Sequence, residues 1–108
     1  MQDLWRQKFR FTKKNNSPIL DVEKRLSYQR EPLEESLLRI SDEYNKAASE
    51  LFVGIMRYTG DYPTLKTWNQ TAQDILYSAI NNVSLRDELY IQLYKQSNGH
   101  PLQYLLVL

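Results

Sequence analysis

The chain has 108 residues, of which 42% are hydrophobic and 12% aromatic, so it can build the core of one small domain and is not wholly disordered. Its 14 Lys and Arg against 13 Asp and Glu give a net charge of +1, which predicts neither general nucleic-acid binding nor adhesion to an acidic membrane. The lack of cysteine excludes disulfides, thiolate catalysis and cysteine-based metal sites. With no signal-peptide or membrane-spanning run in the sequence, we expect a cytoplasmic protein.

The first 30 residues form a basic leader in which neither the helical nor the strand period holds for long. This stretch carries a charge of +5, from eight basic and three acidic residues. Residues 31–61 carry −4, from three basic and seven acidic residues. A basic leader therefore precedes an acidic segment.

We expect a first helix from Pro32 to about Ile40, because proline suits the first helical position and an apolar stripe follows it. The most regular pattern lies in residues 42–59, where apolar side chains recur at three- and four-residue steps. Ser41 is of the type that caps helix starts, and Gly60 is of the type that ends helices.

Two more helices are predicted downstream. One apolar stripe covers residues 72–83 and another covers residues 85–97, with Ser84 as the expected N-cap and Asn98-Gly99 as the stop. The sequence therefore predicts an all-α fold, a compact bundle of about four helices. The core is expected to consist of Phe52, Ile55, Leu76, Ile80, Leu89 and Leu93.

Catalytic and metal-binding chemistry has little support in the sequence. The single histidine, His100, stands between a glycine and a proline, without the partners that a metal site or a catalytic triad needs, and we interpret it as solvent-exposed. Paired acids such as Asp87-Glu88 point in different directions on a helix, so we interpret them as solvated faces or helix-start charges. We therefore expect no enzyme, no cofactor and no metal.

The leader interleaves aromatic and basic side chains, for example at residues 8–11, and this pattern is also typical of single-strand nucleic-acid binding. The competing interpretation is a flank that packs its rings and leaves its lysines in water. A small basic nucleic-acid-binding domain is therefore the alternative function.

Three ordered segments resemble a known family. Residues 50–63 read Glu-Leu-Phe-Val-Gly-Ile-Met-Arg-Tyr-Thr-Gly-Asp-Tyr-Pro and are similar to the Phe-x-x-Ile-Met-x-Tyr-Met-Gly-Asp-x-Pro motif of the myosin tail homology 4 family. Residues 85–96 resemble its Leu-Arg-Asp-Glu-x-Tyr-x-Gln-x-x-Lys-Gln helix, and residues 31–38 its Pro-Leu-x-x-x-Leu-Leu entry helix. The matching signature positions are Phe52, Ile55, Met56, Arg57, Tyr58, Gly60, Asp61, Pro63, Leu85, Arg86, Asp87, Glu88, Tyr90, Gln92, Lys95 and Gln96.

The resemblance implies a helical module from the tails of unconventional myosins, some plant kinesins and certain pleckstrin-homology proteins. In that family the module commonly precedes a FERM domain, binds microtubules or cargo-protein tails, and has no known catalytic role. The resemblance divides the chain into a basic flank (1–30), the helical domain (31–97) and an atypical C-terminal tail (98–108). It also implies a cytoplasmic, cytoskeleton-associated protein.

The sequence departs from the family at two places. Thr59 stands where methionine is frequent, and Leu102–Leu108 stands where the family continues with helices that carry an Arg-Gly-Trp-x-Leu-Leu pattern. The resemblance therefore implies a domain truncated at its C-terminus, with the apolar faces of the last two helices partly open.

We interpret the charged signature residues as structural, because they can cap helices or pair between them. Basic side chains are the better candidates for contacts, since tubulin and many cargo tails are acidic. These candidates are Lys13, Lys14, Lys24, Arg25, Lys66 and Lys95.

Overall fold

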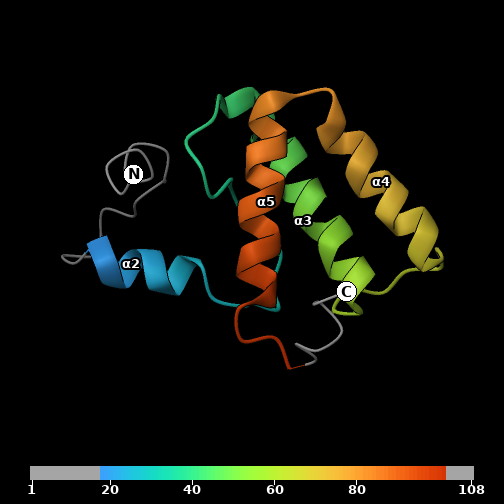
Figure 1. Cartoon of the computed structure of the whole chain (residues 1–108), viewed down its shortest axis with the longest axis horizontal. Helices are drawn as coiled ribbons and strands as arrows, with labels where there is room; N and C mark the ends of the chain where they lie inside the picture. The colour runs from blue at the N-terminus through green and yellow to red at the C-terminus, as the bar shows by residue number, and fades with distance from the viewer. Residues whose placement is uncertain (1–17, 102–108) are drawn as a thin grey trace.

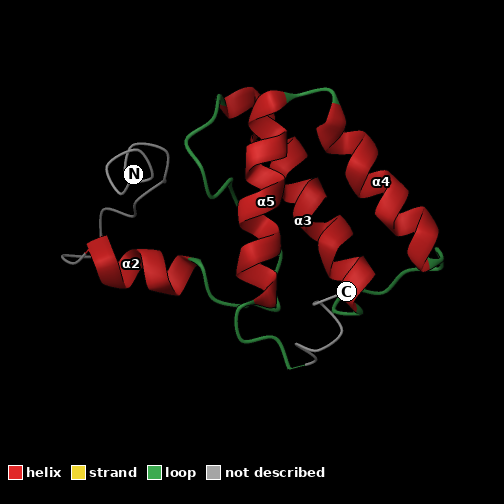
Figure 2. Cartoon of the chain, in the orientation of Figure 1, coloured by secondary structure: helices red, strands yellow, loops and turns green. Residues whose placement is uncertain are grey.

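A computed structural model describes residues 18–101 of the chain (Figure 1). The regular elements in this range are α2 (Pro18–Arg25), the short 3₁₀ helix η1 (Asp42–Tyr44), α3 (Asn45–Thr59), α4 (Trp68–Ile80) and α5 (Val83–Ser97). All of them are helical, as Figure 2 shows. The predicted all-α bundle with four α-helices is therefore confirmed.

Three helices form the body of the bundle. α3, α4 and α5 pack against one another in all three pairs, whereas α2 lies to one side, beyond α5 (Figure 1). An extended segment, residues 26–41, connects α2 to η1. Contacts with α3 and α5 hold this segment in position.

The helix α3 follows the sequence prediction closely. Its buried side chains recur at helical spacing and are Ala48, Leu51, Phe52, Ile55 and Met56. It ends at Gly60, whose left-handed φ of 84° suits glycine, and the next N–H, that of Asp61, donates to the carbonyl of Met56 at 2.8 Å. The helix predicted over residues 42–59 is thus confirmed, and its first turn is the 3₁₀ helix η1.

Two helix starts differ from the prediction. α4 begins at Trp68, four residues early, because Thr67 and Gln70 form a reciprocal capping box. α5 is capped by Asn82, not Ser84, since the Asn82 side chain accepts hydrogen bonds from the N–H groups of Ser84 and Leu85.

The predicted helix from Pro32 to Ile40 does not form. The N–H of Ser36 donates to the Asn45 side chain, and those of Leu37 and Leu38 donate to the Glu88 carboxylate. Side chains from distant elements thus replace the bonds of a helix, which explains the wrong prediction. Conversely, residues 18–25 of the leader form α2, where we expected no regular period.

Half of the predicted core is correct. Phe52, Ile55 and Leu89 are buried, but Leu76, Ile80 and Leu93 are 58%, 60% and 44% exposed. The helix phase explains the error on α4, because its buried ridge is Thr71, Ile75 and Ala79, and Leu76 and Ile80 each lie one residue, or about 100°, beyond it. Leu93 likewise follows the buried Gln92 on α5.

Candidate functional site

The inward face of α5 carries four polar side chains beside the apolar Leu85, Leu89 and Ile91. Glu88, Gln92, Lys95 and Gln96 recur at helical spacing, and each is no more than 2% exposed. All four belong to the signature. Because they are buried, each side chain should have a hydrogen-bond partner inside the protein. The large majority of buried polar groups in proteins are hydrogen-bonded.

Glu88 binds the backbone of the extended segment. Its two carboxylate oxygens accept the N–H groups of Leu37 and Leu38, each at 2.9 Å, and one also accepts the Gln92 amide at 2.8 Å. The same Gln92 amide donates to the carbonyl of Ala48 on α3 at 3.0 Å. Our interpretation of Glu88 as a solvated or helix-start charge was therefore wrong, since it joins α5, α3 and the segment.

Lys95 binds the backbone around the start of this segment, about two turns further along α5 than Glu88. Its Nζ donates to the carbonyls of Arg25 and Ser27 at 2.7 and 2.6 Å. Burial, and then the charge of Arg25, lower the pKa of Lys95 to about 8. Lys95 was wrong as a partner-contact candidate, because its ammonium group is enclosed by the protein's own carbonyls.

The end of α5 continues the pattern. Gln96 and Gln29 exchange two hydrogen bonds between side chain and backbone, at 3.0 and 3.2 Å. The Asn98 side chain donates to the carbonyl of Leu26 at 2.9 Å, and the Asn98 carbonyl accepts the N–H of Tyr28 at 2.9 Å. Glu88, Lys95, Gln96 and Asn98 are called the α5 clamp below, since each of them binds the backbone of residues 25–38.

Asp61 is the centre of a second polar cluster. It accepts hydrogen bonds from the Tyr28 and Thr59 hydroxyls at 2.6 and 2.9 Å, and its Oδ2 lies 2.9 Å from Nε2 of His100. Burial acts to raise the pKa of Asp61, but the hydrogen bonds from Tyr28, Thr59 and His100 outweigh it, and the pKa is lowered. This cluster joins the extended segment to the ends of α3 and α5.

His100 was wrongly expected to be exposed. It is 5% exposed, and its ring meets that of Tyr28 edge-on, with centroids 4.6 Å apart. No local pattern around His100 indicates this burial, because Asp61 and Tyr28 come from distant segments.

Of the other candidate basic residues, Lys24 and Arg25 are neighbours on α2, whereas Lys66 lies elsewhere. Lys24 is exposed on α2, and Arg25 is half-buried, with its guanidinium donating to the Ser36 carbonyl at 3.5 Å. Lys66 is exposed in the loop before α4, where its ammonium forms an ion pair with Asp74. Figure 1 places α2 and this loop on opposite sides of α5. Lys13 and Lys14 lie outside the described residues.

The remaining signature residues divide between core and surface. Leu85 and Met56 are buried, and the Arg57 guanidinium lies 5.3 Å from the centroid of the Tyr62 ring. The exposed signature residues are Tyr58, Gly60, Pro63, Arg86, Asp87 and Tyr90.

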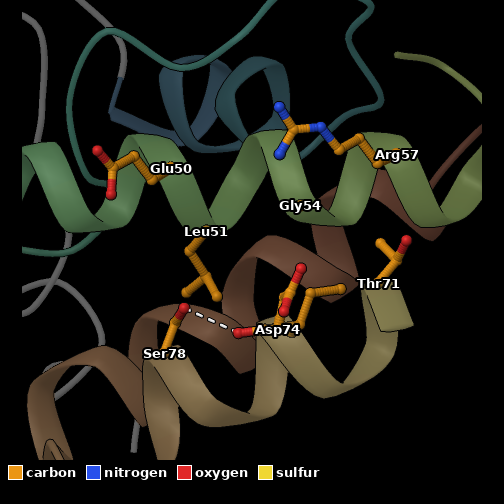
Figure 3. Close-up of a pocket in the computed structure, with 8 residues that line it drawn as sticks. Glu50, Leu51, Gly54, Arg57, Thr71, Asp74 and Ser78 are labelled. Carbon is orange, nitrogen blue, oxygen red and sulfur yellow. Dashed lines mark hydrogen bonds between the residues drawn. The ribbon is translucent and has the colours of Figure 1, made fainter. Parts of the chain in front are cut away.

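A groove of about 360 Å³ lies between α3 and α4 (Figure 3). Leu51, Gly54 and Ile75 supply its apolar lining, and Gly54 allows the close approach of the two helices, since a Cβ there would lie 3.2 Å from Cγ1 of Ile75. Its polar lining comes from Glu50, Arg57, Thr71, Asp74 and Ser78, and Figure 3 shows the Ser78 hydroxyl bonded to the Asp74 carbonyl. This lining contains no imidazole or thiol, so it suits polar contacts better than nucleophilic catalysis.

The described residues also bear on metal-binding and membrane-spanning roles. Between residues 18 and 101, no three His, Asp or Glu side chains are grouped so as to hold a metal ion. The same part of the chain contains no helix with the length and apolar character needed to cross a bilayer.

Sequence comparison relates the chain to the tails of motor proteins. It is 37% identical over 84 residues to human unconventional myosin-XVB, covering 75% of this chain and 3% of that protein. It is 31% identical over 99 residues to the kinesin-like protein KIN-14I of Oryza sativa, covering 84% of this chain and 8% of that protein. The chain thus spans less than a tenth of these relatives, and no family model matches it.

Structure comparison identifies the same kind of module. The MyTH4-FERM MF2 domain of Dictyostelium discoideum myosin VII (mutant 1) matches with a TM-score of 0.77 and 31% identity, covering 94% of this chain and 20% of that one. The human myosin 7b C-terminal MyTH4-FERM domain, solved in complex with the harmonin-a PDZ3 domain, matches with a TM-score of 0.66 and 27% identity, covering 93% and 20%. The described helices therefore have the fold of the helical part of these tails.

Proposed function

The chain belongs to the myosin tail homology 4 (MyTH4) family, and from this premise we propose that it binds acidic protein surfaces, microtubules or cargo-protein tails, for a cytoskeletal motor or adaptor. Homology to myosin tails supports a non-catalytic interaction module as its general role. In this proposal the parent protein is cytoplasmic and cytoskeleton-associated, and carries a FERM domain beside the module.

The direction of the signature side chains supports this proposal. The α5 clamp and Asp61 bind other residues of the same chain, so these side chains stabilise the fold and do not point toward a partner. Partner contacts are then left to exposed side chains, among which Lys24 and Lys66 are cations. Exposed lysines suit an acidic partner, because complementary charge speeds association and selects partners.

The relatives support the class of partner. One solved neighbour, human myosin 7b, is bound to a PDZ domain, which is a protein partner. A plant kinesin-like protein is another relative, and kinesins act on microtubules. The proposal therefore names acidic protein surfaces as the target, and microtubules as the first one to test.

Co-sedimentation with taxol-stabilised microtubules over a series of salt concentrations tests the proposal. We expect binding that weakens as salt rises, and a several-fold loss in the Lys24→Glu, Lys66→Glu double variant. Lys46→Glu is the matched control, because Lys46 is an exposed lysine on α3 that is not one of the candidates. An equal loss of microtubule binding in Lys46→Glu would contradict the proposal. So would a wild-type chain that binds neither microtubules nor acidic peptides.

The nucleic-acid alternative makes a different prediction. Gel shifts with single-stranded RNA at the same salt concentrations would reveal binding with a steep salt slope. A complex with RNA that is tighter than the one with microtubules would favour the alternative over the MyTH4-type role.

A further inference from the structure

A second pocket, of about 370 Å³, lies beside the end of α2 and the start of the extended segment, and it is called the α2 pocket below. Leu33 and Leu37 give it an apolar wall. Leu37 belongs to a buried cluster with Ile91 of α5, and Leu33 packs against that cluster. The volume lies within the range of pockets that hold ligands, so the α2 pocket offers apolar surface to a side chain from outside.

The rim of the α2 pocket is acidic. Three exposed glutamates line it, Glu31, Glu34 and Glu35. The lining also contains the cations Arg25 and Lys95, but both donate to backbone carbonyls of the chain itself. Arg30 is exposed beside Glu31 in the sequence and does not line the pocket. The charge that the pocket presents to solvent is therefore negative.

An occupant that fits this chemistry is basic and aromatic, and the chain itself carries such a segment. Residues 1–17, which lie outside the described residues, have a charge of +4, from five basic residues and one acidic residue. Phe9 and Phe11 alternate there with basic side chains, and Lys13 and Lys14 follow. An aromatic ring suits the apolar wall of the pocket, and the lysines suit the glutamates of its rim.

The length of chain between this segment and the pocket allows the contact. The segment joins α2 at Pro18, and the other end of α2, Arg25, lines the pocket. The eight residues of α2 span about 12 Å. Phe11 precedes Pro18 by seven residues, which reach about 23 Å when they are extended. Phe11 can therefore reach the α2 pocket by running back along α2.

We propose that residues 9–14 dock on the α2 pocket of the same chain, with the Phe11 ring against Leu33 and with Lys13 and Lys14 at the glutamate rim. Because the segment is tethered beside the pocket, its effective concentration there is high, and weak contacts suffice to hold it. The docked segment withholds Lys13 and Lys14 from an acidic partner, a consequence that rests on the proposed function.

Disulfide trapping on the full chain tests this docking, because the chain has no cysteine of its own. Thr12→Cys and Pro32→Cys put one thiol beside Phe11 and one in the lining of the pocket, and they remove no charge. Under mild oxidation of dilute protein we expect a disulfide within one chain, formed several-fold more slowly at high salt. Mass spectrometry of proteolytic fragments quantifies this disulfide, and circular dichroism verifies that each variant is folded.

Charge reversal supplies the matched controls, because it leaves the tether between the two thiols unchanged. Trapping should slow several-fold with Lys13→Glu and Lys14→Glu, and equally with Glu31→Lys and Glu34→Lys, and combining both pairs should restore it. Equal trapping rates in all these backgrounds would show a tether without a docking site and would overturn the proposal. Disulfides that form between chains, and not within one, would also overturn it, and would assign the pocket to a segment of a partner.

Microtubule co-sedimentation tests the consequence for partner binding. Glu31→Gln with Glu34→Gln should release the segment, and we expect tighter binding than for Glu43→Gln with Glu50→Gln, which removes the same charge from two exposed glutamates outside the pocket. Equal binding by the two variants would overturn the withholding of the lysines. Because trapping needs no microtubules, a chain that forms the disulfide but binds no microtubules contradicts the proposed function and not the docking.

Discussion

The carboxylate of Glu88 on α5 accepts a hydrogen bond from the backbone N–H of Leu37 at 2.9 Å, across 51 residues of sequence. The neighbouring N–H of Leu38 binds the other oxygen of the same group at the same distance. Because both leucines lie outside any helix, the carboxylate supplies acceptors that their own segment lacks. A signature residue of the family thus fixes the path of the segment that leads into η1.

Replacing Glu88 should strongly destabilise the domain. Glu88→Ala leaves two buried N–H groups without an acceptor, and we expect a loss of about 3 kcal/mol in the free energy of unfolding. Urea denaturation at neutral pH measures this loss. Glu50→Gln is the control, because Glu50 is exposed on α3, and its effect should stay within about 0.5 kcal/mol. Similar losses in both variants would contradict a specific role for Glu88.

Sequence patterns predicted both α3 and α5 as helices, but they identified the buried face of α3 well and that of α5 poorly, for a physical reason. The buried face of α3 is entirely apolar, so the helical period of its hydrophobic residues identifies the core. The buried face of α5 holds Glu88, Gln92 and Lys95, which a hydrophobicity pattern assigns to solvent. Their spacing places them on one face of the helix, and this could be read from the sequence. The spacing does not indicate which groups they bind.

The partners of these side chains could not be predicted from local sequence. The segment around Leu37 was predicted as a helix because its local preferences favour one, but the side chains of Asn45 and Glu88, farther along the chain, replace the helical bonds. The same holds for His100 and Tyr28, which meet at Asp61. Long-range polar contacts therefore account for the wrong predictions at residues 32–40, Glu88, Lys95 and His100.

The buried Lys95 should make stability rise with pH in the alkaline range. Its pKa is about 8 in the folded protein and about 10.4 in an unfolded chain, so between these values the unfolded state binds more protons. Unfolding free energy should therefore increase from pH 8 towards pH 10. The Tyr28 hydroxyl has the opposite effect above about pH 10. Burial and then its hydrogen bond to Asp61 raise the pKa of Tyr28, so its contribution to the unfolding free energy is lost as the hydroxyl deprotonates.

Urea denaturation at a series of alkaline pH values, on the wild type and on Lys95→Met, measures this effect. The variant should be less stable at every pH, because the carbonyls of Arg25 and Ser27 lose their donor, and its stability should not rise between pH 8 and pH 10. An equal rise in both proteins would assign the effect to other groups.

Asp61 should contribute to the loss of stability in acid. Its pKa is lowered in the folded state, so its contribution is complete above the unfolded value of about 3.9 and is lost as the pH falls through the folded value. Asp61→Asn should be less stable at neutral pH and lose less stability on acidification. Thermal melts between neutral pH and about pH 3 compare the two proteins, and parallel curves would contradict the prediction.

Ile55 should be essential to the core. Ile55→Asp puts an unpaired charge at a position that is 1% exposed, and we expect it to abolish cooperative unfolding. Tyr58→Asp changes a residue on the same helix that is 41% exposed, and it should keep a sharp transition. Differential scanning calorimetry distinguishes them, and an unchanged melt for Ile55→Asp would refute this packing of α3.

The ion pair between Lys66 and Asp74 should limit partner binding. Asp74→Asn removes the carboxylate that Lys66 binds, so the lysine becomes available to an acidic partner, and microtubule co-sedimentation should increase. Lys66→Gln should decrease it. If Asp74→Asn weakens binding instead, the groove carboxylate and not the lysine contacts the partner.

Amide hydrogen exchange at Leu37 and Leu38 most directly tests whether the α5 clamp fixes the extended segment. Amides outside helices usually exchange by local opening at little energetic cost. Because both N–H groups bind the buried Glu88, we predict protection close to that of the α3 core, with selective loss of this protection in Glu88→Gln. Exchange of both amides in the wild type as fast as in exposed loops would contradict the account.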